Sequence, residues 1–248
     1  MGGNQTIYYQ LLASFKDTYA NFINTLDEII NDDISLAIRE VHSLKGAAAN
    51  LSIPDVHLAA KSLEANLKSD TKADLDTFIK TLSEKLDESF DVIDKLTTES
   101  KDEEDTKDEE DTKTKAQEQE IEVKPKILLT EDNPINQQVI IEVLSGDEFF
   151  ELDTADNGKE ALAALEKKSY DLILMDIQMP VMDGLTAAKH IRDNERFKSI
   201  PIIAVTAHAM KGYRELCLNA GMNDYITKPV DKNILHAKIK RWLSKSTA

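Results

Sequence analysis

The chain has 248 residues, with 46 acidic against 30 basic side chains and a formal net charge of −16. This excess of acid argues against general binding to a nucleic-acid backbone, which needs Lys and Arg clustered on one face. The single cysteine, Cys217, excludes an internal disulfide. The sequence has no signal peptide and no apolar run near the roughly 18 residues of a membrane span. We therefore expect a cytoplasmic protein of two domains that is not membrane-embedded.

Large apolar residues recur at helical spacing throughout the first predicted domain, residues 1–97. The pattern falls into five segments, at 8–15, 22–30, from 34, from 54, and from 75 to 93. Only one glycine, Gly46, interrupts them. Amphipathic helices with short joints predict an all-α antiparallel bundle.

The next stretch, residues 98–124, has the composition of a flexible linker. Its segment 98–122 carries twelve acidic and four basic residues and contains the hexad KDEEDT twice in succession. With no aromatic residue and one large aliphatic, it cannot bury enough apolar surface to offset the entropy of ordering. We predict an extended acidic tether between two domains.

Short apolar runs alternate with helical patterns in the second predicted domain, residues 125–248. The strands are expected at 126–130, 149–154, 172–175, 202–205 and 225–226. The helices are expected at 134–144, 159–167, 185–193, 213–219 and 232–243. Strands that are apolar on both faces and alternate with helices predict a doubly wound α/β domain with a parallel sheet.

Polar side chains follow four of these five strands. Glu131 and Asp132 follow the first strand, Asp176 the third, Thr206 the fourth and Lys228 the last. The carboxyl ends of parallel strands line one crevice, so we expect these side chains on one rim. Three carboxylates there favour a hard cation such as Mg²⁺, and a lysine ammonium suits a phosphate oxygen. The rim therefore predicts transfer of a phosphoryl group onto a carboxylate.

Residues 125–245 resemble a two-component response-regulator receiver of the kind attached to hybrid sensor kinases. The matching segments are ILLTEDNPINQQV, DLILMDIQMPVMDG, PIIAVTAHAM and GMNDYITKPV. The resemblance implies a flavodoxin-like sheet of five parallel strands in the order 2-1-3-4-5. It implies that Asp176 accepts the phosphoryl group. It also implies that Mg²⁺ is bound by Glu131, Asp132, Asp176 and the backbone carbonyl of Gln178.

The same resemblance assigns roles to residues around the acceptor. Lys228 contacts the phosphoryl group, and Thr206 and Tyr225 form a switch pair that re-orients on phosphorylation. Gln178 and His208 lie beside the acceptor and are expected to tune the lifetime of the phosphoryl group. Glu131 stands where many members of the family have Asp, which affects metal affinity rather than the ability to bind metal.

The helix predicted from residue 34 carries a histidine on its polar side. At about 100° per residue, His42 lies roughly 110° from the centre of the apolar stripe, so we expect it to be exposed to solvent. Arg39 and Gly46 share that side, and Lys45 is one turn beyond His42. A mid-helix glycine costs about 1 kcal/mol relative to alanine. It either admits another protein surface close to the imidazole or packs against a neighbouring helix.

Residues 42–46, HSLKG, followed by AAANL, resemble the motif of a histidine phosphotransfer (Hpt) domain. This second resemblance covers residues 5–97 and implies a four-helix-bundle core. It implies that His42 accepts the phosphoryl group, with Lys45 as its cationic neighbour; the Arg39 guanidinium could add a second charge. Glu64 lies where such domains often have a polar residue that orients the other ring nitrogen.

Together these patterns predict a two-component phosphorelay protein that passes a phosphoryl group between His42 and receiver aspartates, with Mg²⁺-dependent phosphorylation of Asp176. Without a Gly-rich phosphate loop, it is not expected to be a kinase in itself. Its receiver is expected to catalyse its own phosphorylation and dephosphorylation. The expected partners are a sensor histidine kinase and an upstream or downstream receiver. A contact between the chain's own two domains stays open.

Two alternatives remain. The chain could be a phosphorylation-controlled binding switch whose helical domain only docks partners, or a fragment of a larger hybrid histidine kinase. A haloacid-dehalogenase-like hydrolase is disfavoured, because such an enzyme needs a second Asp where Gln178 stands.

Overall fold

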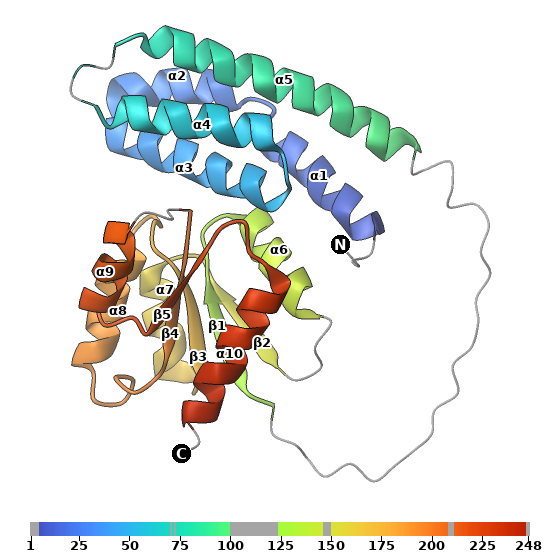
Figure 1. Cartoon of the computed structure of the whole chain (residues 1–248). Coiled ribbons are helices and arrows are strands. Elements are labelled where there is room, and N and C mark those ends of the chain that lie inside the picture. The colour runs from blue at the N-terminus through green and yellow to red at the C-terminus, as the bar shows by residue number, and fades with distance from the viewer. Residues whose placement is uncertain are drawn as a thin grey trace, which may run out of the picture.

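The computed structural model describes residues 5–69, 71, 73–99, 124–145, 150–207 and 211–246. A helical domain lies against one end of an α/β domain (Figure 1). The helical part extends to Glu99, two residues into the stretch predicted as linker. The rest of that prediction falls almost entirely on residues outside the described ranges, and so does His208.

The helical domain is an all-α bundle, as predicted. Its helices are α1 (Gln5–Tyr19), α2 (Phe22–Asp32), α3 (Ile34–Asn50), α4 (Pro54–Leu67) and α5 (Leu75–Glu99). The core contains Phe15, Leu26, Leu44 and Leu63, which are buried side chains from four different helices. The Asp33 carboxylate begins α3 by accepting backbone N–H groups at 2.9 and 3.0 Å. The apolar stripes of the sequence thus face one shared core.

The α/β domain contains one parallel sheet. Its strands are β1 (Lys126–Thr130), β2 (Glu151–Ala155), β3 (Leu172–Asp176), β4 (Ile202–Thr206) and β5 (Asp224–Thr227). They are ordered β2-β1-β3-β4-β5, which confirms the predicted flavodoxin-like arrangement. The central strands β3 and β4 are buried along their whole length, so both faces of the sheet must be covered.

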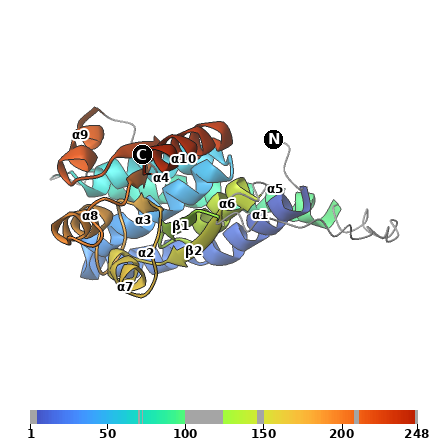
Figure 2. The ribbon, with the colours of Figure 1, turned by 90° about the horizontal axis from the view of Figure 1, so that it is seen from below.

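Helices cover the sheet on both sides, each with its own apolar layer. On one face lie α6 (Pro134–Ser145) and α10 (Lys232–Ser246). On the other lie α7 (Gly158–Lys167), α8 (Gly184–Asp193) and α9 (Lys211–Asn219). Figure 2 shows α7 and α10 on opposite sides of the strands. The loops that follow the strands therefore emerge at one open end of the sheet.

That end of the sheet faces the bundle, with α3 crossing above it (Figure 1). The start of α6 contacts α1 and α3. Ile135 of α6 is 2% exposed and belongs to the apolar core of the bundle rather than to that of the sheet, and Val139 packs beside it. The two domains are thus joined by an apolar contact in addition to their covalent connection.

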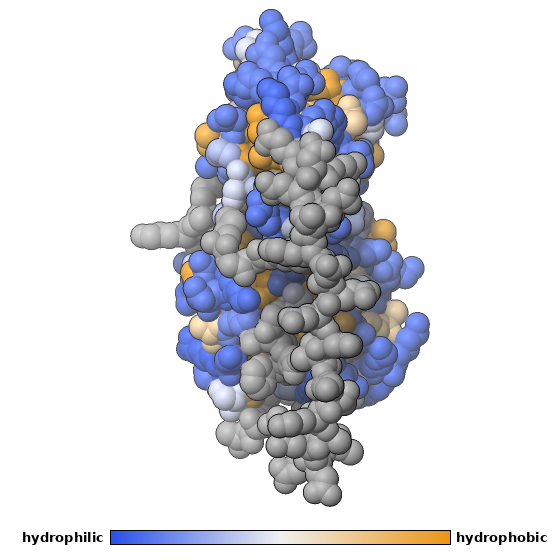
Figure 3. All heavy atoms as spheres, turned by 90° about the vertical axis from the view of Figure 1, so that its right-hand side faces the viewer, coloured by the Kyte–Doolittle hydropathy of each residue, from blue (hydrophilic) through white to orange (hydrophobic). Residues whose placement is uncertain are grey.

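One face of the molecule shows the character of its outer surface. The face in Figure 3 is mostly hydrophilic over both domains, with apolar side chains scattered across it. Within the described ranges, no helix has the length and apolar character needed to cross a bilayer.

Ile135 offers a direct test of the apolar contact. Ile135→Ala should weaken docking of the two domains by roughly 2–4 kcal/mol, because its side chain fills a site in the bundle core. Calorimetry should then show the two domains unfolding more independently. The control is Ile141→Ala in the same helix, which faces the sheet and should destabilise the α/β domain itself. If both variants destabilise only the α/β domain, Ile135 does not hold the domains together.

Candidate functional site

The open end of the sheet gathers the polar residues that follow its strands. Glu131, Asp132 and Asp176 each place a carboxylate oxygen within 4.8 Å of the others. Lys228, after β5, lies between two of them, with Nζ 2.7 Å from Asp176 Oδ2 and 2.7 Å from Glu131 Oε2. Four of the five residues of the predicted rim therefore form one compact cluster, and Asp176 is only 2% exposed.

The backbone after β3 fixes the carboxylate of Asp176. Its Oδ1 accepts the N–H groups of Ile177 and Gln178 at 2.6 and 3.3 Å. The loop then folds back so closely that a Cβ on Gly184 would lie 2.0 Å from the Asp176 carbonyl oxygen. Only glycine can begin α8 there, so the local sequence dictates the close packing that aims Asp176 outward from the sheet.

The bundle presents a second polar cluster, on α3 and α4. His42 Nδ1 lies 3.0 Å from Glu64 Oε1 and 3.2 Å from Lys45 Nζ. Lys45 also forms an ion pair with the other oxygen of Glu64, and Lys68 donates to Glu64 Oε1 at 2.6 Å. The structure thus brings together His42, Lys45 and Glu64, which the sequence singled out. Glu64 contacts a ring nitrogen of His42, as the resemblance implies.

The predicted exposure of His42 is wrong. Its side chain points away from the bundle core, as the helical pattern requires, yet the residue is only 4% exposed. The α/β domain covers this side of α3: a Cβ on Gly46 would lie 3.3 Å from Asn136 Nδ2 and 3.5 Å from Lys228 Cδ. The surface that Gly46 admits close to the imidazole is therefore the chain's own second domain.

Hydrogen bonds across the interface involve residues that the sequence analysis did not single out. Asn133 Nδ2 donates to Tyr19 Oη and to Ser43 Oγ, both at 2.8 Å, while its Oδ1 accepts backbone N–H groups at the start of α6. Asn50 Nδ2 donates to Asn136 Oδ1 at 2.8 Å. The sequence signal for these contacts was the pair Asn133 and Asn136, three residues apart, which follows Glu131 and Asp132 after the first strand.

The carboxylate cluster has more negative charge than the neighbouring positive group, Lys228, can offset. Burial raises the pKa of Glu131 to about 8, with Lys228 opposing the rise. Burial and the charge of Asp176 raise the pKa of Asp132 to about 6. Burial would also raise the pKa of Asp176, but Lys228 and then His42 lower it below the usual value. The raised pKa values of Glu131 and Asp132 indicate that Lys228 alone does not offset the clustered acidic groups, so the site favours a further cation.

The electrostatic surroundings favour a neutral imidazole. Burial lowers the pKa of His42, Glu64 opposes this, and Lys45 adds to it. Asp176 also acts on the ring across the interface and raises its pKa. At neutral pH His42 therefore retains a nitrogen lone pair, which a nucleophile requires.

The remaining predicted site residues are Thr206, Tyr225 and Arg39, and they lie in different surroundings. Thr206 is buried at the end of β4, in register with Thr227 of β5. Tyr225 is half-buried, with Lys238 Nζ 5.7 Å from its ring centre. The charge of Arg39 acts on neighbouring Glu40. The roles of Thr206, Tyr225 and Arg39 stay predictions.

The donor set of the carboxylate cluster fits a hard divalent cation such as Mg²⁺. Oxygens from Glu131, Asp132 and Asp176 converge, which is the ligand chemistry that Mg²⁺ prefers. Nearby, Gln178 Oε1 is buried without a hydrogen-bond partner among the described residues. A buried orphan oxygen of this kind is suited to water held in a cation's shell.

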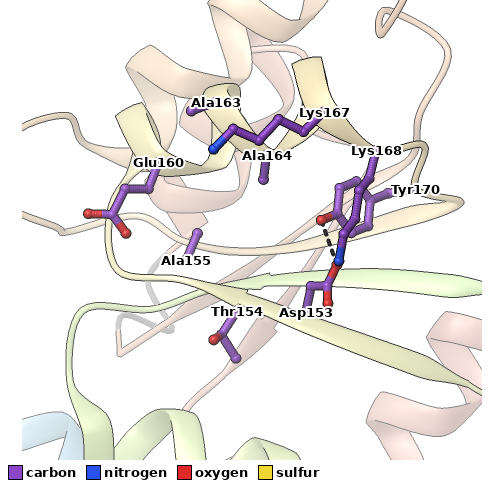
Figure 4. A pocket seen from close by; sticks show the side chains of 9 residues that line it. All are labelled: Asp153, Thr154, Ala155, Glu160, Ala163, Ala164, Lys167, Lys168 and Tyr170. Carbon is purple, nitrogen blue, oxygen red and sulfur yellow. Dashed lines mark hydrogen bonds and ion pairs between the residues drawn. The ribbon is translucent and has the colours of Figure 1, made fainter.

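A separate pocket lies at the edge of the sheet, between β2 and α7 (Figure 4). Its volume is about 450 Å³. The charged groups that line it include Asp153, which accepts from both Lys168 and Tyr170 at 2.7 Å. None of the predicted site residues lines this pocket, so it is distinct from the site at the strand ends.

Comparison with known proteins identifies both domains. Residues 127–240 match the response regulator receiver domain family, and residues 10–96 match the Hpt domain family. The chain is 42% identical over 130 residues to hybrid signal transduction histidine kinase I of Dictyostelium discoideum, over 50% of this chain and 7% of that protein. It is 40% identical over 116 residues to the signal transduction histidine-protein kinase BarA of Escherichia coli, over 47% of this chain and 12% of that protein.

A solved structure resembles the second domain. It is the receiver domain of the sensor histidine kinase PA1611 from Pseudomonas aeruginosa, with a magnesium ion coordinated in its active site cleft. It is 43% identical and covers 49% of this chain and 98% of its own, with a TM-score of 0.46. The two family matches together span most of the chain. The protein therefore belongs to the two-component signalling proteins and joins an Hpt domain and a receiver domain, the domain types of phosphorelay signalling.

Gly46→Ala should change the stability of the bundle and domain docking in opposite directions. Alanine should stabilise α3 by about 1 kcal/mol, because glycine is the weaker helix former. Its methyl group would press on Asn136 Nδ2 and touch Lys228, so docking should weaken. Thermal unfolding and hydrogen exchange at the interface would measure the two effects. Stronger docking together with a more stable helix would contradict the close approach at Gly46.

Proposed function

We propose that this protein is a phosphorelay component in which His42 and Asp176 are the two phosphoacceptors and exchange a phosphoryl group. The observation that carries the proposal is that both residues are buried at one interface, where each shifts the pKa of the other. A nucleophilic imidazole and a nucleophilic carboxylate buried together in this way suit direct transfer.

The ring of His42 is set up for this exchange. The Glu64 carboxylate can only accept, so we assign the proton to Nδ1 and the phosphoryl group to Nε2; Lys45, which can only donate, then donates to Glu64 and not to the ring. In one direction the Nε2 lone pair attacks phosphorus and the Asp176 carboxylate leaves with the electrons of the O–P bond. In the other, an Asp176 oxygen attacks and the N–P bond breaks, returning its electrons to Nε2. Neither direction needs an added proton, because Nδ1–H is kept throughout.

The residues around Asp176 stabilise the group in transit. Lys228 already contacts Asp176 Oδ2 and can follow a phosphoryl oxygen bound there. Oxygens of Glu131, Asp132 and Asp176, with the backbone carbonyl of Gln178, would hold Mg²⁺. When bound, Mg²⁺ supplies charge that neutralises phosphoryl oxygens. Thr206 and Tyr225 would then respond to the occupied site as the switch pair.

The docked arrangement affects outside partners. We propose a sensor histidine kinase and further receivers as partners, and each must reach a His42 or an Asp176 that is now covered. External exchange therefore requires the two domains to separate. A binding switch in which the bundle only docks partners is the second candidate, and the packing of α1 and α3 against α6 of the receiver is what favours it.

Phosphoryl mapping separates the two candidates. The 248-residue wild type, His42→Ala and Asp176→Ala would be incubated with Mg²⁺ and a small phosphodonor such as acetyl phosphate. Intact mass would count the groups, and acid or base lability would distinguish phosphohistidine from aspartyl phosphate. We expect label at Asp176 in wild type and His42→Ala, label at His42 in wild type, and none at either residue in Asp176→Ala.

Other outcomes have defined meanings. If Asp176 is labelled in wild type and His42 never is, the relay within this chain is wrong and the docking role gains. Mixing His42→Ala with Asp176→Ala at several concentrations shows whether transfer occurs within one chain or between two. Label on His42 in Asp176→Ala would contradict the route through the receiver.

Glu64→Gln should slow transfer at His42 while leaving phosphorylation of Asp176 by the small donor unchanged. The amide keeps the size of the side chain but removes the charge that holds the proton on Nδ1. The expected loss is roughly tenfold, in line with the about 1.5–3 kcal/mol of a hydrogen bond to a charged group. Rapid-quench measurement of phosphohistidine decay would test it. Equal rates in wild type and variant would remove Glu64 as the orienting residue.

A further inference from the structure

Asn136 joins the two domains through the two ends of one amide. The residue lies in the first turn of α6 and is 1% exposed. Its Nδ2 donates to Glu131 Oε1 at 2.8 Å, inside the receiver. Its Oδ1 accepts from Asn50 Nδ2 at 2.8 Å, across the interface. The amide that supports a carboxylate of the proposed cation site is thus itself held by the bundle.

Asn50 is anchored in turn by the receiver backbone. It is the last residue of α3, and its Oδ1 accepts the N–H of Val230 at 3.2 Å. Val230 lies two residues beyond Lys228, in the loop after β5. One side chain of the bundle therefore binds two separate segments of the receiver, and both adjoin the charged cluster.

These hydrogen bonds form a chain with only one allowed direction. A backbone N–H can only donate, so the oxygen of Asn50 must face Val230 and its NH₂ must face Asn136. The oxygen of Asn136 must then face Asn50, which turns its NH₂ toward Glu131. The carboxylate of Glu131 accepts at the end of the chain. Without Asn50, the Asn136 amide would be held only at its Glu131 end, and the position of its NH₂ group relative to the carboxylates would no longer be fixed from the bundle side.

We propose that Asn50 and Asn136 make the bundle part of the receiver's cation site. Docking fixes the amide of Asn136, and this amide holds Glu131 Oε1 in place among the converging carboxylates. Asn136 is thus a positioning residue, and Asn50 is the group through which the bundle acts on it. The inference rests on the cation site of the proposed function, and it adds that this site is fully formed only when the domains are docked.

Domain docking and cation binding are thermodynamically linked in this arrangement. If docking strengthens binding of a divalent cation, the cation must strengthen docking by the same factor. The backbone N–H of Val230 reports docking, because its acceptor is on the bundle. Mg²⁺ should therefore slow hydrogen exchange at Val230 in the wild type.

The test is calorimetric titration of the 248-residue chain, with both domains present, with Mg²⁺ alone. Asn136→Ala should lower the association constant on the order of tenfold, as removal of a group that orients a metal ligand does. Asn50→Ala should lower it on the order of fivefold, the effect of one neutral hydrogen bond. The double variant should bind no more weakly than Asn136→Ala, because Asn50 acts through Asn136. In Asn136→Ala, Mg²⁺ should no longer slow exchange at Val230.

Two further variants keep the result decisive. Asn24→Ala removes an exposed bundle asparagine that is bonded to Asn21, and it should leave Mg²⁺ binding unchanged. Asn50→Asp keeps the acceptor for Val230 but loses the donor for Asn136, so it should also bind Mg²⁺ more weakly. The inference would be overturned if Asn50→Asp or Asn50→Ala bound Mg²⁺ with wild-type affinity. It would also be overturned if the losses of the two single variants in association constant multiplied in the double variant.

The titration uses no phosphodonor, so its failure can be told apart from failure of the proposed function. If the wild type binds no Mg²⁺, the proposed cation site itself is wrong. If the wild type binds Mg²⁺ and the Asn50 variants bind it equally well, only the coupling to the bundle is wrong.

Discussion

The ion pairs of Lys228 hold two buried carboxylates at the end of the sheet, and the arrangement of the other charges follows from them. Lys228 contacts both Glu131 and Asp176, yet the cluster that includes Asp132 keeps more negative than positive charge. The bundle brings charges of both signs: Lys45 and Lys68 pair with Glu64, while the charge of Glu40 acts on Asp132 across the interface and raises its pKa. A bound cation is therefore better suited than the bundle to offset the excess negative charge of the cluster.

Docking of the bundle on its own receiver favours that receiver over outside partners and also restricts their access to the interface. Residues 100–123 connect the two domains covalently, and a covalent connection can raise the effective concentration of one domain near the other to about the millimolar range. An outside partner competes against that concentration, and its apparent affinity falls in proportion to the fraction of open molecules. In the proposed relay, the same burial that brings His42 and Asp176 together would limit their exchange with other proteins. A cation bound at the carboxylate cluster would shift this balance further toward the docked form, if docking strengthens cation binding as proposed.

The sequence predicted most of the fold because periodicity reports packing within a domain. The stripe of Ala37, Val41, Leu44 and Ala48 is buried as expected, and the polar residues after the strands meet at one rim. The same reasoning failed for His42, because the apolar stripe of a helix describes contacts with its own core only. A polar face that is buried against a second domain has the same pattern as a polar face in water.

The interface asparagines were missed for a related reason. Asparagine is common in turns and at helix ends as well as in interfaces. The spacing of Asn50, Asn133 and Asn136 therefore does not show which groups they bond to. Only the docked structure shows that Asn133 bonds to Tyr19 and Ser43. Gly46 was the one visible clue, since a costly mid-helix glycine indicated a close approach without indicating what approached.

Apolar and polar contacts make different contributions to this interface. Ile135 and Val139 bury surface against the bundle, and such burial is non-directional, so it permits α6 to slide or rotate. The one-way hydrogen bonds through Asn50 and Asn136 allow a single register. A foreign receiver with an apolar side chain in place of Asn136 could still bury its helix, but it would leave the Asn50 amide unpaired at a cost of about 1–3 kcal/mol. Discrimination between receivers therefore comes mainly from the polar groups that a wrong partner fails to satisfy.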